Sequence, residues 1–286
     1  MFSQNIKIAF FGNSDFSLIV LEELKQKGVL VDLVVTTADK PVGRKMILTP
    51  TPTKVWAENN SVEYIAPEKL KDESFLKKIS EYNLFIVASY GKIIPKIILD
   101  MPEYHALNVH PSLLPKYRGP SPLQEQILND EKFVGVTIML IDEQVDHGAI
   151  VSAKKVDVPG WPVGFHELEK ILAKEGADII AKILPDWIKG NITETQQKDD
   201  QATFTKKVEK ADGLLDLTID AHKNYLKYLA FEVWPGTYFE IEKDGRKIRV
   251  IIKKAIWKDN SFEILRVIPE GKKEMDYKDF LRGFNK

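Results

Sequence analysis

The sequence predicts an α/β protein with a nucleotide-fold-like (Rossmann-type) N-terminal domain and a small C-terminal β domain. The first observation is that short apolar runs, typical of buried strands, alternate with segments of helical period through the first half of the chain. The second is a polar stretch, GNITETQQKDDQA, which starts at Gly190 and is typical of a linker. The third is a series of short strand-like runs beyond Asp216, separated by DG, DN and EGKK turns.

The first strand and helix are predicted at the N-terminus. The apolar run 6–11 ends at Gly12, and Ser14-Asp15 can cap a helix that Gly28 ends. The apolar residues of this helix that share one face are Phe16, Ile19, Val20 and Leu24. A strand followed at once by a helix is the repeating unit of a parallel sheet.

The same alternation continues along the chain. The further predicted elements are a strand at 30–36, a helix at 53–59, a strand at 62–65, a helix at 73–81, strands at 84–88, 134–141 and 149–156, and a long helix at 162–189. The segment Gly12-Asn13-Ser14 lacks the GxGxxG fingerprint, and no GxxxxGK[ST] motif occurs. The sequence therefore gives no support for a dinucleotide site or an ATP phosphate site.

The predicted boundaries divide the chain into a catalytic domain at 1–189, a linker at 190–205 and a C-terminal domain at 206–286. In the last of these, strand-like runs are predicted at 237–241, 247–255 and 262–268. Periodicity alone predicts only several strands there.

Composition narrows the class of protein. A chain of 286 residues with 44% hydrophobic content can build a packed core. The start lacks the basic and apolar regions of an export signal, and no apolar run approaches the ~18 residues of a membrane span, so we expect an unexported, cytoplasmic protein. With no cysteine and five histidines, no metal site is proposed.

Three polar residues form the candidate catalytic site. Asn108 and His110 lie two apart after an apolar pair, so on a strand their side chains would point to the same face. Asp146 follows the apolar run 134–141, and a turn between them could return its carboxylate to the imidazole of His110. Taken singly, each has a structural alternative: a strand end for Asn108 and turn positions for His110 and Asp146. Together they supply a donor, an acid and a base in one place.

These residues stand in NVHPSLLPKYRGP and VDHG, where the sequence resembles the N10-formyltetrahydrofolate-dependent formyltransferases. Within that family the resemblance is to the methionyl-tRNA formyltransferases. The motifs that carry this closer resemblance are DKPVGR, LTPTPTKVWAE, KYRGPSPLQ and WPGTY. The resemblance runs from the first strand nearly to the C-terminus, and it implies an OB-like β-barrel for the C-terminal domain.

The resemblance implies transfer of the formyl group of 10-formyltetrahydrofolate to the α-amine of methionine on initiator tRNA. Asn108 and protonated His110 would each donate a hydrogen bond to the oxyanion that forms, and loss of such a donor typically costs roughly 10²–10³-fold in rate. Asp146 would hold the imidazole in its charged form and help to move the proton lost by the amine.

The resemblance also implies two sets of binding residues. Those expected around the folate are Val87, Ala88, Ser89, Tyr90, Gly91, Ser112, Leu113, Leu114, Pro115 and Asp142. Those expected to contact tRNA are Lys40, Arg44, Lys45, Lys206, Lys207 and Lys210. Because the net charge of the chain is -1, tRNA binding would depend on such local basic patches. No membrane partner is implied, and we expect a monomer.

Two other classes of function remain open. An amino-sugar N-formyltransferase would use the same three residues and the same folate donor with a nucleotide-linked sugar as acceptor. A catalytically silent RNA-binding module is the non-enzyme alternative, and intact Asn108, His110 and Asp146 argue against it.

Overall fold

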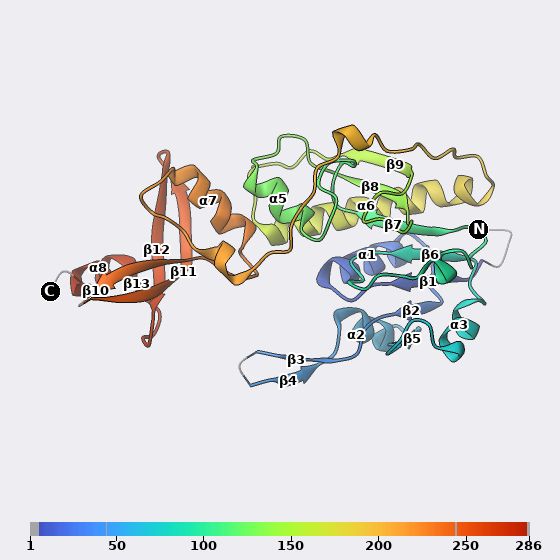
Figure 1. Ribbon diagram of the computed structural model, residues 1–286, viewed down its shortest axis with the longest axis horizontal. Coiled ribbons are helices and arrows are strands. Elements are labelled where there is room, and N and C mark those ends of the chain that lie inside the picture. The colour runs from blue at the N-terminus through green and yellow to red at the C-terminus, as the bar shows by residue number, and fades with distance from the viewer. Residues whose placement is uncertain (1–5, 44, 244, 285–286) are drawn as a thin grey trace. The chain divides into compact units, whose positions relative to one another are not determined.

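The computed structural model describes residues 6–43, 45–243 and 245–284, and it divides into two compact units (Figure 1). Unit 1 comprises residues 1–119, 133–157 and 169–204, and unit 2 comprises 120–132, 158–168 and 205–286, each apart from its undescribed residues. The units are therefore not contiguous in sequence, unlike the division drawn from the sequence. Most of the segment 190–205 belongs to unit 1.

A seven-stranded sheet forms the centre of unit 1. Its strands, in spatial order, are β5 (Glu63–Ile65), β2 (Leu33–Val35), β1 (Ile8–Phe11), β6 (Leu84–Val87), β7 (Ala106–His110), β8 (Gly135–Leu140) and β9 (Ile150–Lys155). From β5 to β7 the pairing is parallel, whereas the pairs β7–β8 and β8–β9 are antiparallel. The predicted parallel half is confirmed. The carboxyl end of β7, where ligands bind in open α/β sheets, thus lies beside the start of β8.

Helices of unit 1 connect the strands and cover the sheet. They are α1 (Asp15–Gln26), α2 (Pro52–Asn59), α3 (Glu73–Ile79), α4 (Lys96–Leu99) and most of α6 (Phe165–Ile188). Ser14 caps α1 as predicted, since its side chain accepts a hydrogen bond from the backbone N–H of Ser17. Phe10, Phe11 and Phe85 are fully buried, so they are core residues rather than a ligand-stacking surface.

A hairpin that the sequence did not predict precedes α2. It consists of β3 (Lys40–Val42) and β4 (Ile47–Thr49), which extend away from the seven-stranded sheet (Figure 1). At its base the Lys54 Nζ lies 2.8 Å from Asp39 Oδ2. The side chains of Met46, Ile47 and Leu48 are all more than 60% exposed.

Unit 2 contains a small antiparallel sheet, as the sequence predicted. Its strands, in spatial order, are β10 (Tyr238–Lys243), β11 (Arg246–Lys258), β12 (Ser261–Pro269) and β13 (Met275–Asp276). Three helices of this unit were not predicted: α5 (Pro122–Leu128), α7 (Ala221–Ala230) and α8 (Tyr277–Phe284). The core between the sheet and the helices α7 and α8 includes Leu215, Phe239, Val250, Val267 and Phe280. None of the helices in the described part of the chain is both long and apolar enough to cross a bilayer.

Candidate active site

The end of β7 brings Asn108 and His110 to the carboxyl edge of the sheet. Asn108 is half-buried, and its side-chain amide makes no hydrogen bond to any other residue in the described part of the chain. His110 is buried, with a side chain only 5% exposed. Val109 between them packs into the core at 1% exposure. The strand therefore separates one apolar anchor from two polar groups, as its period of two requires.

The imidazole of His110 is held between two acceptors. Its Nε2 lies 3.1 Å from the carbonyl oxygen of Tyr117, and its Nδ1 lies 3.6 Å from Asp146 Oδ1. A carbonyl oxygen can only accept, so Nε2 carries a proton and donates it to Tyr117. Nδ1 is left as the nitrogen that faces the carboxylate.

Asp146 reaches His110 from a turn whose backbone is in the left-handed region, with φ +49° at Asp146 itself. The backbone N–H of Gly119 donates to its Oδ2 at 2.8 Å. That contact occupies one carboxylate oxygen and directs the other toward His110. The predicted return of Asp146 to the imidazole is therefore present in the structure.

His147, next in the chain, belongs to a second polar cluster. Its Nδ1 lies 2.6 Å from Asp142 Oδ2, and its Nε2 lies 3.5 Å from Asp199 Oδ2. The hydrogen bond to Asp142 raises the pKa of His147 above its ordinary value, with the charge of Asp199 adding to the effect. Asp142, expected near the folate, thus serves first to hold this imidazole.

The loop after β7 is fixed by two buried hydroxyl groups, one of its own and one from β8. The Ser112 hydroxyl donates to the carbonyl of Lys116 at 2.7 Å, and the Thr137 hydroxyl donates to the carbonyl of Ser112 at 2.7 Å. The backbone N–H of Leu114 donates in turn to the Thr137 hydroxyl at 3.1 Å. Of the four residues 112–115 expected at the folate, Ser112 and Leu114 are buried and hold the loop.

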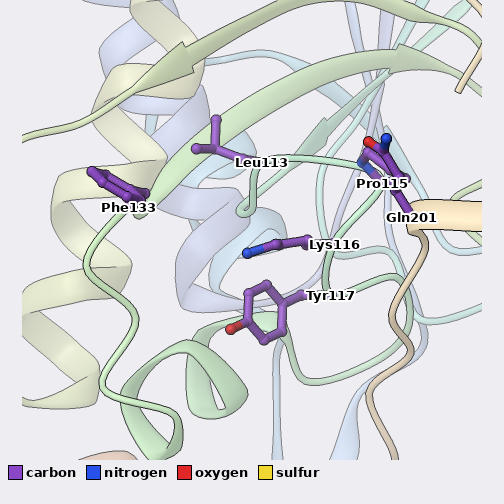
Figure 2. Close-up of a pocket in the computed structure, with 6 residues that line it drawn as sticks. All are labelled: Leu113, Pro115, Lys116, Tyr117, Phe133 and Gln201. Carbon is purple, nitrogen blue, oxygen red and sulfur yellow. The ribbon is translucent and has the colours of Figure 1, made fainter. Parts of the chain in front are cut away.

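Leu113 and Pro115 instead line a cavity of ≈ 240 Å³ beside this loop (Figure 2). Its other lining residues are Lys116, Tyr117, Phe133 and Gln201. Figure 2 shows the side chains of Lys116 and Tyr117 extending from the loop to the same side. The Lys155 Nζ lies 3.7 Å from the centre of the Phe133 ring, so a cation and an aromatic surface meet at this wall. Since Tyr117 also binds His110 through its carbonyl, the cavity adjoins the candidate catalytic residues.

The segment 87–91 follows β6 at the same edge of the sheet. The Ala88 carbonyl accepts from the Ser17 hydroxyl at 2.6 Å, and the Tyr90 carbonyl accepts from Asn13 Nδ2 at 2.8 Å. The Tyr90 ring is buried against Phe11, and burial raises the pKa of its hydroxyl to about 12. Ser89 and Gly91 are exposed, both at positive φ. The exposed positions of this turn, rather than the Tyr90 ring, are open to a ligand.

The expected tRNA-binding residues lie in two places, one in each unit. Lys40 is exposed on β3 and Lys45 is exposed in the turn of the hairpin, while Arg44 lies outside the described residues. Lys206, Lys207 and Lys210 are exposed in unit 2, where the Lys206 Nζ pairs with Asp212 at 2.9 Å.

Two residues of this region were not predicted from the sequence to belong to the site. Arg118, only 3% exposed, contacts Gln197, and Gln197 in turn contacts the backbone around Asp146. Arg118 was seen only as part of a motif, and Gln197 stands in a polar stretch that looks like a linker. An arginine within a loop is the one signal that the sequence offers, and it reveals neither the burial of this residue nor its partner.

Comparison with known proteins places this site in a family. The family model described as formyl transferase matches residues 6–184. Methionyl-tRNA formyltransferase of Halalkalibacterium halodurans is 33% identical, over 97% of this chain and 95% of its own length. That of Campylobacter lari is 37% identical, over 96% of each chain. The N-formyltransferase of Helicobacter canadensis, solved with folinic acid and dTDP-3-aminofucose, shares the fold with a TM-score of 0.58 and 16% identity, over 91% of this chain and 95% of that one. The chain belongs to the formyl transferase family.

Proposed function

We propose that this chain transfers the formyl group of 10-formyltetrahydrofolate to the α-amine of methionine on initiator methionyl-tRNA, and so acts in translation initiation in the cytoplasm. The observation that carries the proposal is the meeting of Asn108, His110 and Asp146 at one edge of the sheet. The relatives that align over nearly the whole chain are methionyl-tRNA formyltransferases, which supports tRNA as the acceptor.

Asn108 is the group best placed to bind the formyl oxygen. Its side-chain N–H groups have no hydrogen-bond partner within the described residues, and the side chain is only half-buried. A preorganised amide donor aimed at an oxygen that gains negative charge lowers the barrier to acyl transfer. The donor molecule supplies an activated formyl group at its N10 nitrogen.

His110 has a more restricted role than the sequence suggested. Its Nε2–H is committed to the Tyr117 carbonyl, which fixes the ring, so Nδ1 is the nitrogen available to the reactants. An imidazolium that donates from Nδ1 would be stabilised by Asp146 at 3.6 Å. As the amine attacks the formyl carbon and the bond from that carbon to N10 breaks, Asp146 accepts the proton that the amine loses and passes it through water to the departing N10 nitrogen. The Gly119 N–H keeps the other oxygen of Asp146 in place.

The residues at this edge fit a folate. The cavity walls of Leu113, Pro115, Tyr117 and Phe133 suit an aromatic body, and Lys116 suits a carboxylate. The exposed turn of Ser89 and Gly91 offers backbone groups for the pterin. The neighbour from Helicobacter canadensis was solved with folinic acid, a folate, and this supports the assignment of a folate donor.

The acceptor would bind through the two basic regions. Lys40 and Lys45 of the β3–β4 hairpin, together with Arg44, would contact the acceptor end of the tRNA. Lys206, Lys207 and Lys210 would contact it from unit 2, which we assign as a tRNA-binding domain. We expect a monomer, because one chain carries both the donor site and the acceptor contacts.

An amino-sugar acceptor is the second candidate. The Helicobacter canadensis neighbour was solved with dTDP-3-aminofucose, which favours this candidate, but at 16% identity the likeness is one of fold. An amino-sugar enzyme has no evident use for the hairpin and its lysines.

The deciding experiment supplies 10-formyltetrahydrofolate with methionyl initiator tRNA, methionyl elongator tRNA or dTDP-linked amino sugars, and measures release of tetrahydrofolate. We expect turnover with the initiator tRNA alone. Turnover with a sugar alone would keep the three catalytic residues and overturn the tRNA acceptor. No turnover with any acceptor would point to a binding module.

A further inference from the structure

The turn that carries Asp146 is held by a side chain that lies 51 residues further along the chain. Gln197 Nε2 donates to the carbonyl of Asp146 at 2.9 Å and to the carbonyl of Gly148 at 2.8 Å. One amide group thus uses both of its hydrogens on two carbonyls of the same turn. Asp146 has a positive φ, a conformation that costs a non-glycine residue energy. Such a conformation persists where the surrounding structure holds it in place.

Arg118 fixes which way the Gln197 amide faces. Its Nε and Nη2 donate to Gln197 Oε1 at 3.0 and 2.8 Å, and Nη2 also donates to Asp199 Oδ1 at 2.8 Å. A guanidinium has donors only, so the amide oxygen must face Arg118 and the NH₂ must face the turn. The buried arginine therefore presents Gln197 as a donor to the Asp146 turn in one orientation.

The segment around Gln197 is tied to the catalytic loop along its length. We name residues 195–203 the clamp segment. Thr195 exchanges two backbone hydrogen bonds of 2.8 Å with Ile150 on β9. The Thr203 hydroxyl accepts from the Tyr117 N–H at 2.8 Å, and the Thr203 carbonyl accepts from the Arg118 N–H at 2.9 Å. Residues 117 and 118 thus join the clamp segment to the loop whose Tyr117 carbonyl orients His110.

We infer that Gln197, oriented by Arg118, is a positioning residue for the transfer reaction, because it sets the Asp146 carboxylate against His110. The inference rests on the proposed function. Two of the three groups that hold the pair, the Tyr117 carbonyl and the Gly119 N–H, come from the loop after β7. The third, the Gln197 amide, holds the backbone of Asp146 itself. Gln197, although it stands in the polar stretch that the sequence presents as a linker, thus helps to position the catalytic groups.

Gln197→Glu is the sharpest test. The new carboxylate can still accept from Arg118, so the buried guanidinium keeps a partner. The carbonyls of Asp146 and Gly148 lose their donor and face an acceptor instead. Gln196→Glu is the matched control, since it makes the same change of charge on the exposed neighbouring residue. We expect Gln197→Glu to lower kcat on the order of 10²-fold, the effect of small misplacement of a catalytic group, with the KM for both substrates nearly unchanged. The control should match the wild type.

A double-mutant cycle separates positioning from general destabilisation. In an Asp146→Asn background, Gln197→Glu should change kcat by less than about 3-fold, because residues that act through one another are not additive. A similar loss in both backgrounds, or an unchanged kcat for Gln197→Glu alone, would overturn the inference. If Gln197→Glu does not fold, Gln197→Ala, which leaves room for water between Arg118 and the carbonyls, is put through the same cycle with the same criteria.

A measurement without substrate keeps this inference separate from the proposed function. The Gly119 N–H donates to Asp146 Oδ2, so hydrogen exchange at that amide reports how firmly the carboxylate is held. We expect faster exchange at Gly119 in Gln197→Glu than in the wild type and in Gln196→Glu. If exchange at Gly119 is faster in Gln197→Glu while the wild type shows no formyl transfer, the clamp is supported and the proposed function is rejected. Unchanged exchange would reject the clamp.

Discussion

At the scale of single residues, the site depends on hydrogen bonds to backbone groups, each of which can act only as a donor or only as an acceptor. The Tyr117 carbonyl can only accept, and the Gly119 N–H can only donate. Between them they fix the ring of His110 and the carboxylate of Asp146 without adding a titratable group. Substitutions at His110 and Asp146 therefore change the chemistry while the backbone partners stay.

His110→Ala should abolish formyl transfer, because it removes the group that links Asp146 to the reactants. Asp146→Asn should lower kcat by about 10²–10⁴-fold, the range for loss of an acid–base group. Asp200→Asn, on an exposed carboxylate, is the control. Binding of initiator tRNA, measured by filter retention, should be nearly unchanged in all three variants. Parallel loss of binding and turnover would instead indicate misfolding.

His147 gives the site a pH-dependent part of its stability. Because Asp142 raises its folded-state pKa, this stabilisation is complete below the unfolded pKa near 6.5 and is lost as pH rises through the higher folded value. His147→Gln should therefore lower Tm relative to the wild type at pH 5.5, and the difference should shrink by pH 8.5. Thermal unfolding at the two pH values tests this. A difference that grows with pH would contradict the assigned cause.

The sequence indicated the three candidate catalytic residues but not what holds them. Asn108 and His110 are two apart on a strand, and Asp146 follows the neighbouring antiparallel strand, so local patterns carry that geometry. Gly119 acts through its backbone N–H, and the identity of the residue does not reveal such a contact. Gln197 is distant in sequence, and loop residues of this type are ordinarily solvated. Contacts of these two kinds arise only from the folded chain.

At the scale of elements, the position of β7 depends on the helix packed behind it. Gly176 on α6 faces Val109, the buried residue between Asn108 and His110. A Cβ at position 176 would overlap Val109 Cγ1, and both belong to a close-packed core. The fit between α6 and β7 thus reaches Asn108 and His110 through Val109.

Gly176→Ala should destabilise the protein by about 1–3 kcal/mol through overpacking, despite the better helix propensity of alanine. It should also lower kcat, since any shift of Val109 moves its two neighbours. Gly283→Ala on α8 is the control, because a Cβ there meets nothing within 4 Å. Denaturant unfolding and steady-state kinetics measure the two effects. An unchanged or raised stability in Gly176→Ala would show that the core yields without cost.

Element boundaries followed the strength of the local signal. The predicted strand at 84–88 and helix at 53–59 match β6 and α2 within a residue, because each has a clear apolar pattern and a flanking stop. The β3–β4 hairpin was missed because its strands are three residues long and their apolar side chains on β4 are exposed. α7 was missed because it lies in a region dominated by strand-like runs. Its helical backbone is seen only in the folded chain.

At the scale of the whole molecule, a net charge of -1 excludes general attraction to a polyanion. Local clusters must then supply the counterion release that drives tRNA binding. The structure offers the hairpin cluster, with Lys40 and Lys45 exposed, and the unit 2 cluster at 206–210. Within the second cluster the Lys206 charge is already shared with Asp212, so its contribution should be smaller.

Removal of a cluster should therefore flatten the salt dependence of tRNA binding in proportion to the phosphates lost. Each lost contact should reduce the slope of log K against log salt by roughly 0.7–0.9. We expect the triple variant Lys40→Ala, Arg44→Ala, Lys45→Ala to lose both slope and affinity for initiator tRNA, with the KM for 10-formyltetrahydrofolate unchanged. Within unit 2, Lys207→Ala should reduce the slope more than Lys206→Ala, because Lys206 gives up a protein partner when it turns to a phosphate. Titrations of labelled tRNA across a salt series measure these slopes. Equal slopes in the wild type and the hairpin variant would exclude that cluster from the tRNA interface and leave unit 2 as the basic surface that binds it.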